Sequence, residues 1–566
     1  MPAQPSPSPY SPYVGRGAAV RFAGTTELGA PPKALPTPPA WGATVPRPSR
    51  SEGALPFLTV AQAASLIKRR RLSPVELTQA LLARIQRLNP LLNAYITVTA
   101  DLALRQARDA ESAIMRGDYL GPLHGIPVSL KDLIGTAGVL TTGGTGALSD
   151  WVPTEDAVVW QRLRKVGAVL LGKVGLHEMA AGFSSINPFF GPTHNPWDPQ
   201  RVTGGSSGGS GASVAGHLAL ASIGSDTAGS IRVPSSLCGI VGLKPTFGRV
   251  STRGALYLSW SLDHLGPMTK TVEDAALLLN VIAGYDPLNA LSAPAPTDRY
   301  TADLRKGVRG LRLAVPANYF WEFEVPSLPS PDAHPGEPNA ASPERSEGFV
   351  EGRQGLDPVV AGAVRDAIQV LRDLGATVSE VEIEGLEELQ ASTINIERAF
   401  FVEEIPLERR ERFSETYRNS IQRGLESPAA EYLRHLQRIQ RTQELLEKAL
   451  EGYDAYVLPT TPLTAPTIAA VEEATAAAAA RAAAASAAGA PPPTGGGGTG
   501  PLANVGRYTS PFNRSGQPAL SIPCGFSHGL PIGLMIVGHR FNERTVLRIG
   551  HAYQQATDWH KRRPAL

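Results

Sequence analysis

The sequence predicts an α/β protein with a large, mixed but mostly parallel central β-sheet that is covered by helices on both faces. Two observations favour this fold. Short apolar segments typical of buried strands recur along the chain, and helical patterns lie between many of them. The chain has 566 residues, of which 42% are hydrophobic and 18% charged, so it is long and apolar enough to bury a sizeable core.

The first expected elements are helices with recognisable start signals. Thr59 with Gln62, and Ser73 with Glu76, form capping-box patterns, and Pro74 occupies a first helical position. Leucine and isoleucine then recur every three or four residues, which indicates an amphipathic helix. Further helices are expected at 101–115 and 156–166. The expected strands are 125–130, 168–171, 218–223, 238–243, 311–315, 376–381, 455–458, 519–522 and 533–537.

Composition divides the chain into a leader and one catalytic domain. Residues 1–55 are rich in proline, serine and glycine and have no sustained period, which predicts a disordered leader; a proline-rich docking tail is the alternative. The domain at 56–566 is interrupted at 326–356 and 472–500 by low-complexity stretches that are interpreted as surface insertions. Alanine has the highest helix propensity, so the alanine run in the second insertion favours a helix.

Charge and cysteine content exclude several classes of function. Lysine and arginine total 53 and aspartate and glutamate 51, so nothing indicates broad binding to nucleic acid or to an acidic membrane surface. The two cysteines, Cys238 and Cys524, cannot form a disulfide framework, and Cys238 is expected to be a buried thiol. No apolar run is long enough to span a membrane and no secretory signal opens the chain, so a cytoplasmic location is expected.

The strongest chemical signal is a pair of small-residue segments. Residues 204–213 read GGSSGGSGAS, and residues 224–232 read GSDTAGSIR after an apolar stretch. Small residues allow tight turns and close backbone approach, and a row of amides there can bind an anion or oxyanion. A phosphate-binding loop is excluded because no lysine occurs between Lys173 and Lys244. A serine nucleophile is plausible, but no G-x-S-x-G elbow with an obvious Asp/His pair accompanies it.

Lys131 is the candidate base. It follows the apolar run Gly125-Ile126-Pro127-Val128-Ser129-Leu130, which is expected to draw it into the interior. Burial disfavours the charged ammonium and lowers the pKa of a lysine, so a neutral amine becomes available near pH 7.

These residues resemble the amidase signature family. The resemblance is carried by GGSSGGSGASVAG and GSDTAGSIRVPSSLCGIVGLKP, with GPLHGIPVSLKDLI upstream. Ser206 lies 75 residues after Lys131, and Ser230 lies 24 residues after Ser206, as the family's Ser–cis-Ser–Lys triad requires. The likeness runs from about residue 56 to the C-terminus, apart from the two insertions.

The resemblance implies a covalent mechanism for this chain. Ser230 would be the nucleophile, Ser206 the bridging serine after a cis peptide bond, and Lys131 the base. The oxyanion hole would be formed by the backbone N–H groups of Thr227, Ala228, Gly229 and Ser230. The family usually has glycine at position 228, so Ala228 raises the question whether the turn there needs a positive φ.

Further residues receive supporting roles. Asp226 and Arg232 are expected to hold the turn by hydrogen bonds. Met179 and Phe183 are expected to line an apolar pocket entrance, with core packing as the alternative, and the family likeness also implies that helices in 392–440 line the pocket. Ser207 is expected to hydrogen-bond the triad or to cap the turn, and it is assigned with Met179 and Phe183 to substrate binding. His124 and His217 are expected to be structural. No metal and no organic cofactor are implied.

The family resemblance leaves two functions open. The first is a stand-alone amidase that cleaves a linear amide, or a carbamate (urethane), anilide or ester, and that works on a small molecule without nucleic acid or membrane. The alternative is the glutamine-hydrolysing A subunit of a tRNA-dependent amidotransferase. That polypeptide carries an acidic residue where this chain has Gly506, in Gly506-Arg507-Tyr508-Thr509, so the stand-alone amidase is favoured. Family members are often dimers, so a homodimer is an open expectation.

Overall fold

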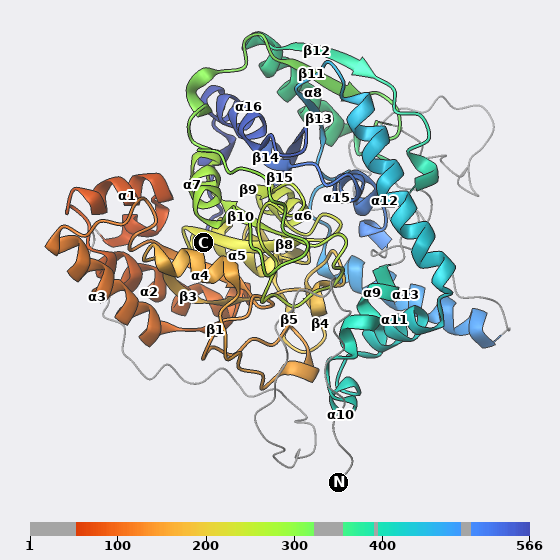
Figure 1. The fold of residues 1–566 in the computed structure, drawn as a ribbon, viewed down its shortest axis with the longest axis horizontal. Coiled ribbons are helices and arrows are strands. Elements are labelled where there is room, and N and C mark those ends of the chain that lie inside the picture. Colours follow the sequence, from red (N-terminus) through yellow and green to blue (C-terminus); the bar gives the residue numbers. More distant parts are fainter. Residues whose placement is uncertain (1–51, 322–354, 390–393, 488–499) are drawn as a thin grey trace.

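The computed structural model describes residues 52–321, 355–389, 394–487 and 500–566. Their centre is an eleven-stranded sheet (Figure 1). In spatial order its strands are β1 (Tyr95–Val98), β3 (Val169–Val174), β2 (Pro127–Lys131), β8 (Ala221–Asp226), β10 (His264–Thr269), β9 (Val241–Lys244), β14 (Ala519–Ser527), β15 (Leu530–Gly538), β13 (Ala455–Pro459), β11 (Arg312–Pro316) and β12 (Thr377–Val381).

The large mixed sheet confirms the predicted fold class, but the expected excess of parallel strands is not found. Within the described residues, six strand pairs of this sheet are antiparallel and four are parallel. One cause is the hairpin of β14 and β15, whose two-residue connection His528-Gly529 can only join antiparallel strands. The intervening helices suggested parallel crossovers, but β10, for example, runs antiparallel to both β8 and β9.

Helices cover both faces of the sheet, and the alternation of side chains along β15 shows this directly. A Cβ at Gly533 would contact Ser236 of helix α6 (Arg232–Cys238), whereas a Cβ at Gly538 would contact Val546 of helix α16 (Glu543–Ala556). Positions of odd and even number in a strand face opposite sides, so α6 and α16 lie on different faces. Apolar residues between these layers form the main core.

Several predicted boundaries are confirmed. Thr59 and Gln62 form a reciprocal capping box at the start of α1 (Val60–Lys68). The Ser73 hydroxyl caps α2 (Pro74–Leu92), where Pro74 is the first residue, but Glu76 makes no return bond, so the predicted Ser73–Glu76 box is only half formed. The alanine run is helical within α13 (Ile468–Ala487). The remaining α-helices of the described residues are α3 (Ala100–Arg116), α4 (Val158–Lys165), α5 (Gly208–Ala215), α7 (Val272–Ile282), α8 (Pro358–Asp373), α9 (Ile394–Val402), α10 (Leu407–Arg410), α11 (Glu415–Glu426), α12 (Ala429–Ala449), α14 (Val505–Thr509) and α15 (Pro511–Arg514).

Other predicted boundaries differ from the observed ones or fall on residues that the structure does not describe. Cys238 was expected in a strand but ends α6, where it is fully buried, and burial raises the pKa of its thiol. The strand after it begins only at Val241, because the left-handed Gly239 ends the helix. The predicted leader lies outside the described residues except for the short 3-10 helix Glu52–Phe57, and most of the insertion at 326–356 also lies outside them. No described helix is both long and apolar enough to cross a membrane.

Candidate active site

Two neighbouring parallel strands bring the candidate residues together. Strand β2 ends at Lys131, and β8 pairs with it in parallel through Val128 with Ala221 and Leu130 with Ile223. The carboxyl ends of parallel strands meet at the same edge of a sheet, so Lys131 and the turn after Asp226 lie close together. Helix α5 begins within the first small-residue segment, at Gly208, and α6 begins at the last residue of the second, Arg232.

The Lys131 amine is fully buried among three serine hydroxyls. Its Nζ lies 2.6 Å from Oγ of Ser206, 2.9 Å from Oγ of Ser207 and 2.8 Å from Oγ of Ser225. Burial lowers the pKa of Lys131 to about 7, although Asp263 and Asp226 act to raise it. A substantial fraction of this lysine is therefore neutral near pH 7, which is the condition for a general base.

The serine-rich segments supply the other candidate triad positions. The peptide bond between Gly205 and Ser206 is cis, as the family resemblance implies. Ser230 lines a cavity, and its carbonyl accepts a hydrogen bond from the N–H of Ser207 at 3.2 Å. No hydrogen bond joins the hydroxyls of Ser206 and Ser230 within the described residues. Such contacts often tighten only when substrate is bound, so both serines remain candidates.

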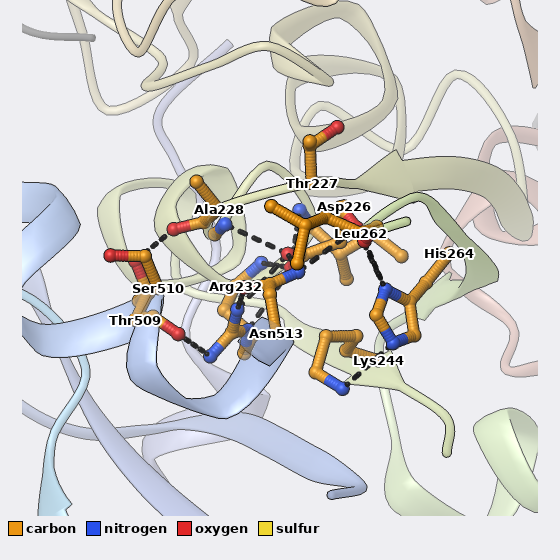
Figure 2. Close-up of polar contacts among 12 residues, drawn as sticks. Asp226, Thr227, Ala228, Arg232, Lys244, Leu262, His264, Thr509, Ser510 and Asn513 are labelled. Carbon is orange, nitrogen blue, oxygen red and sulfur yellow. Dashed lines mark hydrogen bonds and ion pairs between the residues drawn. The ribbon is translucent and has the colours of Figure 1, made fainter. Parts of the chain in front are cut away.

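Asp226 and Arg232 hold the turn that carries Ser230, as predicted (Figure 2). Arg232 Nε and Nη2 donate to the two Asp226 carboxylate oxygens, each at 3.0 Å. The carboxylate also accepts from the N–H groups of Gly229 at 2.7 Å and Ile231 at 3.0 Å. Asn513 Nδ2 donates to it at 2.8 Å, so helix α15 is tied to the same turn. Burial alone would raise the pKa of Asp226, but Arg232 holds it well below its usual range.

The turn leaves three of the four predicted oxyanion-hole N–H groups available. The Gly229 N–H donates to the Asp226 carboxylate, so it is not available to an oxyanion. The N–H groups of Thr227, Ala228 and Ser230 donate to no group within the described part of the chain. Ala228 is not among the residues with positive φ, whereas Gly229 has a φ of 139°, so alanine fits position 228 without backbone strain.

Replacing Gly229 with alanine is expected to disrupt this turn. A Cβ there would lie 2.2 Å from Oγ1 of Thr509 and would need a φ that alanine rarely adopts. We expect Gly229→Ala to lower kcat/KM by roughly two orders of magnitude, the scale of losing one oxyanion donor, because the altered turn would displace the neighbouring N–H groups of Ala228 and Ser230. The control is Gly117→Ala, whose φ is 102° but whose Cβ would meet open space. If both variants keep wild-type activity in a steady-state assay, the turn does not need glycine at 229.

Asp263 supports the turn from outside the sequence-predicted set. Its carboxylate accepts from the Thr227 hydroxyl at 2.5 Å and from the N–H groups of Leu258 and Ser259 at 2.8 and 3.1 Å. Burial raises the pKa of Asp263 to about 6, although these hydrogen bonds act to lower it. Ser225 was also missed, since its contact with Lys131 depends on strand pairing that the sequence does not display.

A cavity of about 350 Å³ opens onto Ser230, Thr227 and Ala228. Phe183 lines this cavity, as predicted. Met179 does not: it packs with Trp151, Phe413 and other apolar residues in a separate cluster. Ser207 is fully buried against Lys131 and is absent from the lining, so its geometry fits positioning of the lysine rather than contact with substrate.

The cavity wall combines apolar and cationic residues. Leu258, Leu262 and Phe183 contribute apolar surface, while Arg398, Arg507 and Arg514 contribute guanidinium groups. No aspartate or glutamate occurs in this lining as far as the structure describes it. Gly506 is also in the wall, and a Cβ there would make ordinary contact with the Phe183 ring at 3.4 Å. Among the described residues, no cluster of histidine, cysteine and acidic side chains could hold a metal ion.

A buried lysine among serine hydroxyls lies beside a cavity and a turn whose N–H groups at Thr227, Ala228 and Ser230 have no partner among the described residues. This is the arrangement expected of a serine-dependent acyl-transfer site. The sequence matches the Amidase family over residues 76–328 and 348–547, and the chain belongs to this family.

Comparisons with individual proteins reach across most of the chain. It is 39% identical to the A subunit of the glutamyl-tRNA(Gln) amidotransferase of Chloroflexus aggregans, over 90% of this chain and 99% of that protein. Among solved structures, 6-aminohexanoate cyclic dimer hydrolase superposes with a TM-score of 0.75 at 29% identity, covering 90% of this chain and 99% of the other. The peptide amidase of Stenotrophomonas maltophilia gives a TM-score of 0.71 at 29% identity, with 90% and 99% covered.

These comparisons alter the ranking of functions made from the sequence. The solved structures include simple amide hydrolases, but the relative with 39% identity is named as part of a tRNA-dependent amidotransferase. The glutamine-hydrolysing alternative is therefore at least as well supported as the stand-alone amidase. The expectation that nucleic acid plays no part gains no support from that relative.

Proposed function

We propose that this chain hydrolyses a carbon–nitrogen amide bond through an acyl-enzyme on Ser230. The observation that carries the proposal is the contact between buried Lys131 and Ser206, next to a cavity lined by Ser230. A lysine with a pKa near 7 can accept a proton at neutral pH, and membership of the Amidase family supports the same chemistry.

The proposed mechanism has two stages. Neutral Lys131 takes a proton from Ser206 while Ser206 takes the proton of Ser230, whose oxygen attacks the substrate carbonyl. The oxyanion binds the N–H groups of Thr227, Ala228 and Ser230, each of which contributes about 2.7–4 kcal/mol to stabilising the transition state. The proton then returns to the leaving amine, and the amine departs. Water hydrolyses the acyl-serine by the reverse route and restores the free enzyme.

The leaving amine is ammonia, from glutamine, in the second candidate function. The observation in its favour is the 39% identity to the amidotransferase protein of Chloroflexus aggregans over almost its whole length. Glutamine also carries an α-ammonium group, and an ammonium buried without an anionic partner is unfavourable. The described cavity lining holds arginines and Gly506 but no carboxylate, which favours a neutral or anionic amide over a zwitterion.

A hydrolysis panel tests the proposed function. Purified protein is assayed on an anilide, a primary amide, an aryl carbamate, an ester and glutamine, each in parallel with Ser230→Ala. We expect at least one amide to be cleaved and the alanine variant to be inactive. Glutamine cleavage alone, or activity only after the other amidotransferase polypeptides are added, would favour the second candidate. Equal rates for the wild type and Ser230→Ala would contradict the acyl-serine mechanism.

Introducing a carboxylate at Gly506 is expected to improve glutamine as a substrate. A side chain fits there at ordinary contact distance from Phe183, so Gly506→Asp would place an acid in the cavity wall. We expect the KM for glutamine to fall about tenfold, the scale of one charge-assisted hydrogen bond, while neutral amides are unaffected. Gly506→Asn, which has the same shape without the charge, is the matched control. An equal effect of both substitutions on KM would rule out pairing with the ammonium group.

A further inference from the structure

A second cavity of about 790 Å³ lies away from the candidate active site. It is bounded by the 3-10 helix Glu52–Phe57, by α1, by the start of α7 and by the end of α16. Its lining shares no residue with the cavity at Ser230. A volume of this size is within the range of roughly 300–1,000 Å³ typical of small-molecule sites.

The two cavities are at opposite ends of the same pair of strands. In β8 and β10, His264 pairs with Asp226 beside the catalytic turn, whereas Thr269 pairs with Ala221 at the far end. Lys270 follows Thr269 and lines the second cavity. Five steps along a strand span about 17 Å, so a ligand in the second cavity would not contact Ser230.

Lys270 is the feature that gives this cavity a chemical preference. Only 7% of this residue is exposed, and its Nζ has no hydrogen-bond partner in the described chain. It also forms no ion pair there. Burial lowers the pKa of Lys270 to about 8, assisted by Arg563, so the amine is still mostly protonated at pH 7. A buried cation without a counter-ion is unfavourable unless a ligand supplies the opposite charge.

The surroundings of Lys270 strengthen this preference. Burial and then three cations, Lys270, Arg84 and Arg563, lower the pKa of His217, which lines the same cavity. Glu273 is the one acid in the described lining. Gln554 is buried, and its Nε2 has no hydrogen-bond partner among the described residues, although its Oε1 accepts from the N–H of Val272 at 2.8 Å. The cavity therefore combines a positive potential with a buried amide donor that is still available.

We propose that this second cavity binds a small organic phosphate, with Lys270 and Arg563 neutralising the phosphate and Gln554 donating a hydrogen bond to it. A phosphate monoester carries a charge of about −1.5 to −2 at pH 7. It therefore neutralises two cations more completely than a carboxylate ligand, which carries one negative charge. The volume leaves room for the organic group beyond the phosphate. Binding here is independent of the proposed amide chemistry, because no residue is shared.

The test uses the full chain and defined probes. Inorganic phosphate and adenosine monophosphate are titrated by isothermal calorimetry at constant ionic strength into the wild type, Lys270→Met and Lys165→Met. Lys165 is an exposed lysine on α4 that does not line the cavity, so Lys165→Met makes the same chemical change away from the proposed site. We expect the nucleotide to bind the wild type and Lys165→Met alike, and Lys270→Met at least tenfold more weakly. Inorganic phosphate should bind the same site more weakly than the monoester.

Thermal unfolding and amide hydrolysis of Lys270→Met distinguish loss of the phosphate site from loss of the fold. Ligand-free Lys270→Met should unfold at the same temperature as the wild type or higher, since it no longer buries an unpaired charge. If that variant does not fold, Gln554→Leu takes its place and should also weaken binding. The proposal is overturned if neither probe binds the wild type, if Lys270→Met binds with unchanged affinity, or if inorganic phosphate and the monoester bind equally well. Amide hydrolysis should be unchanged in Lys270→Met in the absence of phosphate.

Discussion

Replacing Lys131 with methionine is expected to lower kcat by roughly 10⁴-fold or more while leaving the protein folded. Methionine fills a similar volume but cannot accept a proton, and loss of one member of a catalytic triad typically costs this much. Because Lys131 is fully buried and burial opposes its charge, an apolar replacement should not lower the free energy of unfolding substantially. The measurements are steady-state hydrolysis of the best substrate from the panel and urea-induced unfolding.

The pH dependence of the wild type gives an independent view of the same group. The base is active when it is neutral, so kcat/KM should rise about tenfold per pH unit below pH 7 and level off above it, following the Lys131 pKa of about 7. Lys131→Arg should be as inactive as the methionine variant, because arginine keeps its proton at every accessible pH.

Ser225→Ala is the control for indirect effects on the lysine. It removes one of the three hydroxyls around Nζ but leaves Ser206 and Ser207 in place, so the loss in rate should be tenfold or less. The apparent pKa in the pH profile of kcat/KM should also shift, because the Lys131 amine loses one hydrogen-bond acceptor. Lys131→Met activity within tenfold of the wild type would exclude this lysine as the general base.

The parts of this site that could be predicted from sequence are those encoded locally. The glycine and serine segments, the apolar strand before Lys131, and the Asp226 and Arg232 positions all lie within short stretches whose residue types suggest their use. Burial of Lys131 followed from the apolar run, and the structure confirms it. The capping signals at Thr59 and Ser73 are equally local: the first forms the complete capping box, and the second forms the N-cap without the return bond from Glu76.

What could not be predicted depends on contacts between distant segments. Asp263 acts on Thr227 only because β10 pairs with β8, and the residues around Asp263 in sequence do not display that pairing. Met179 illustrates the opposite error. It lies next to cavity residues in sequence, but at a φ of 46° it packs instead into the cluster around Trp151 and Phe413. The prediction of mostly parallel strands was wrong for the same reason, because contacts along the whole chain set the order and direction of the strands.

Replacing Asp226 with asparagine is expected to lower the free energy of unfolding by about 3–5 kcal/mol, because it leaves the buried Arg232 guanidinium without its counter-ion. Both side chains of this pair are fully buried, and the carboxylate is the common acceptor for Arg232, Gly229, Ile231 and Asn513 (Figure 2). Asparagine has nearly the same shape and keeps one oxygen, so the effect measures charge rather than volume. The measurement is urea-induced unfolding followed by circular dichroism.

The same substitution should also lower kcat in the protein that remains folded, because the Gly229 N–H is held by this carboxylate and the adjacent N–H groups form the proposed oxyanion hole. Asp198→Asn is the matched control: it removes the same charge from a partly exposed pair with Arg201 and should cost only about 0.2–1 kcal/mol with no change in rate. If Asp226→Asn lowers stability but the folded enzyme retains wild-type kcat, the carboxylate serves folding alone. A loss of both indicates that the ion pair that stabilises α6 against the sheet is also what fixes the geometry of the oxyanion turn.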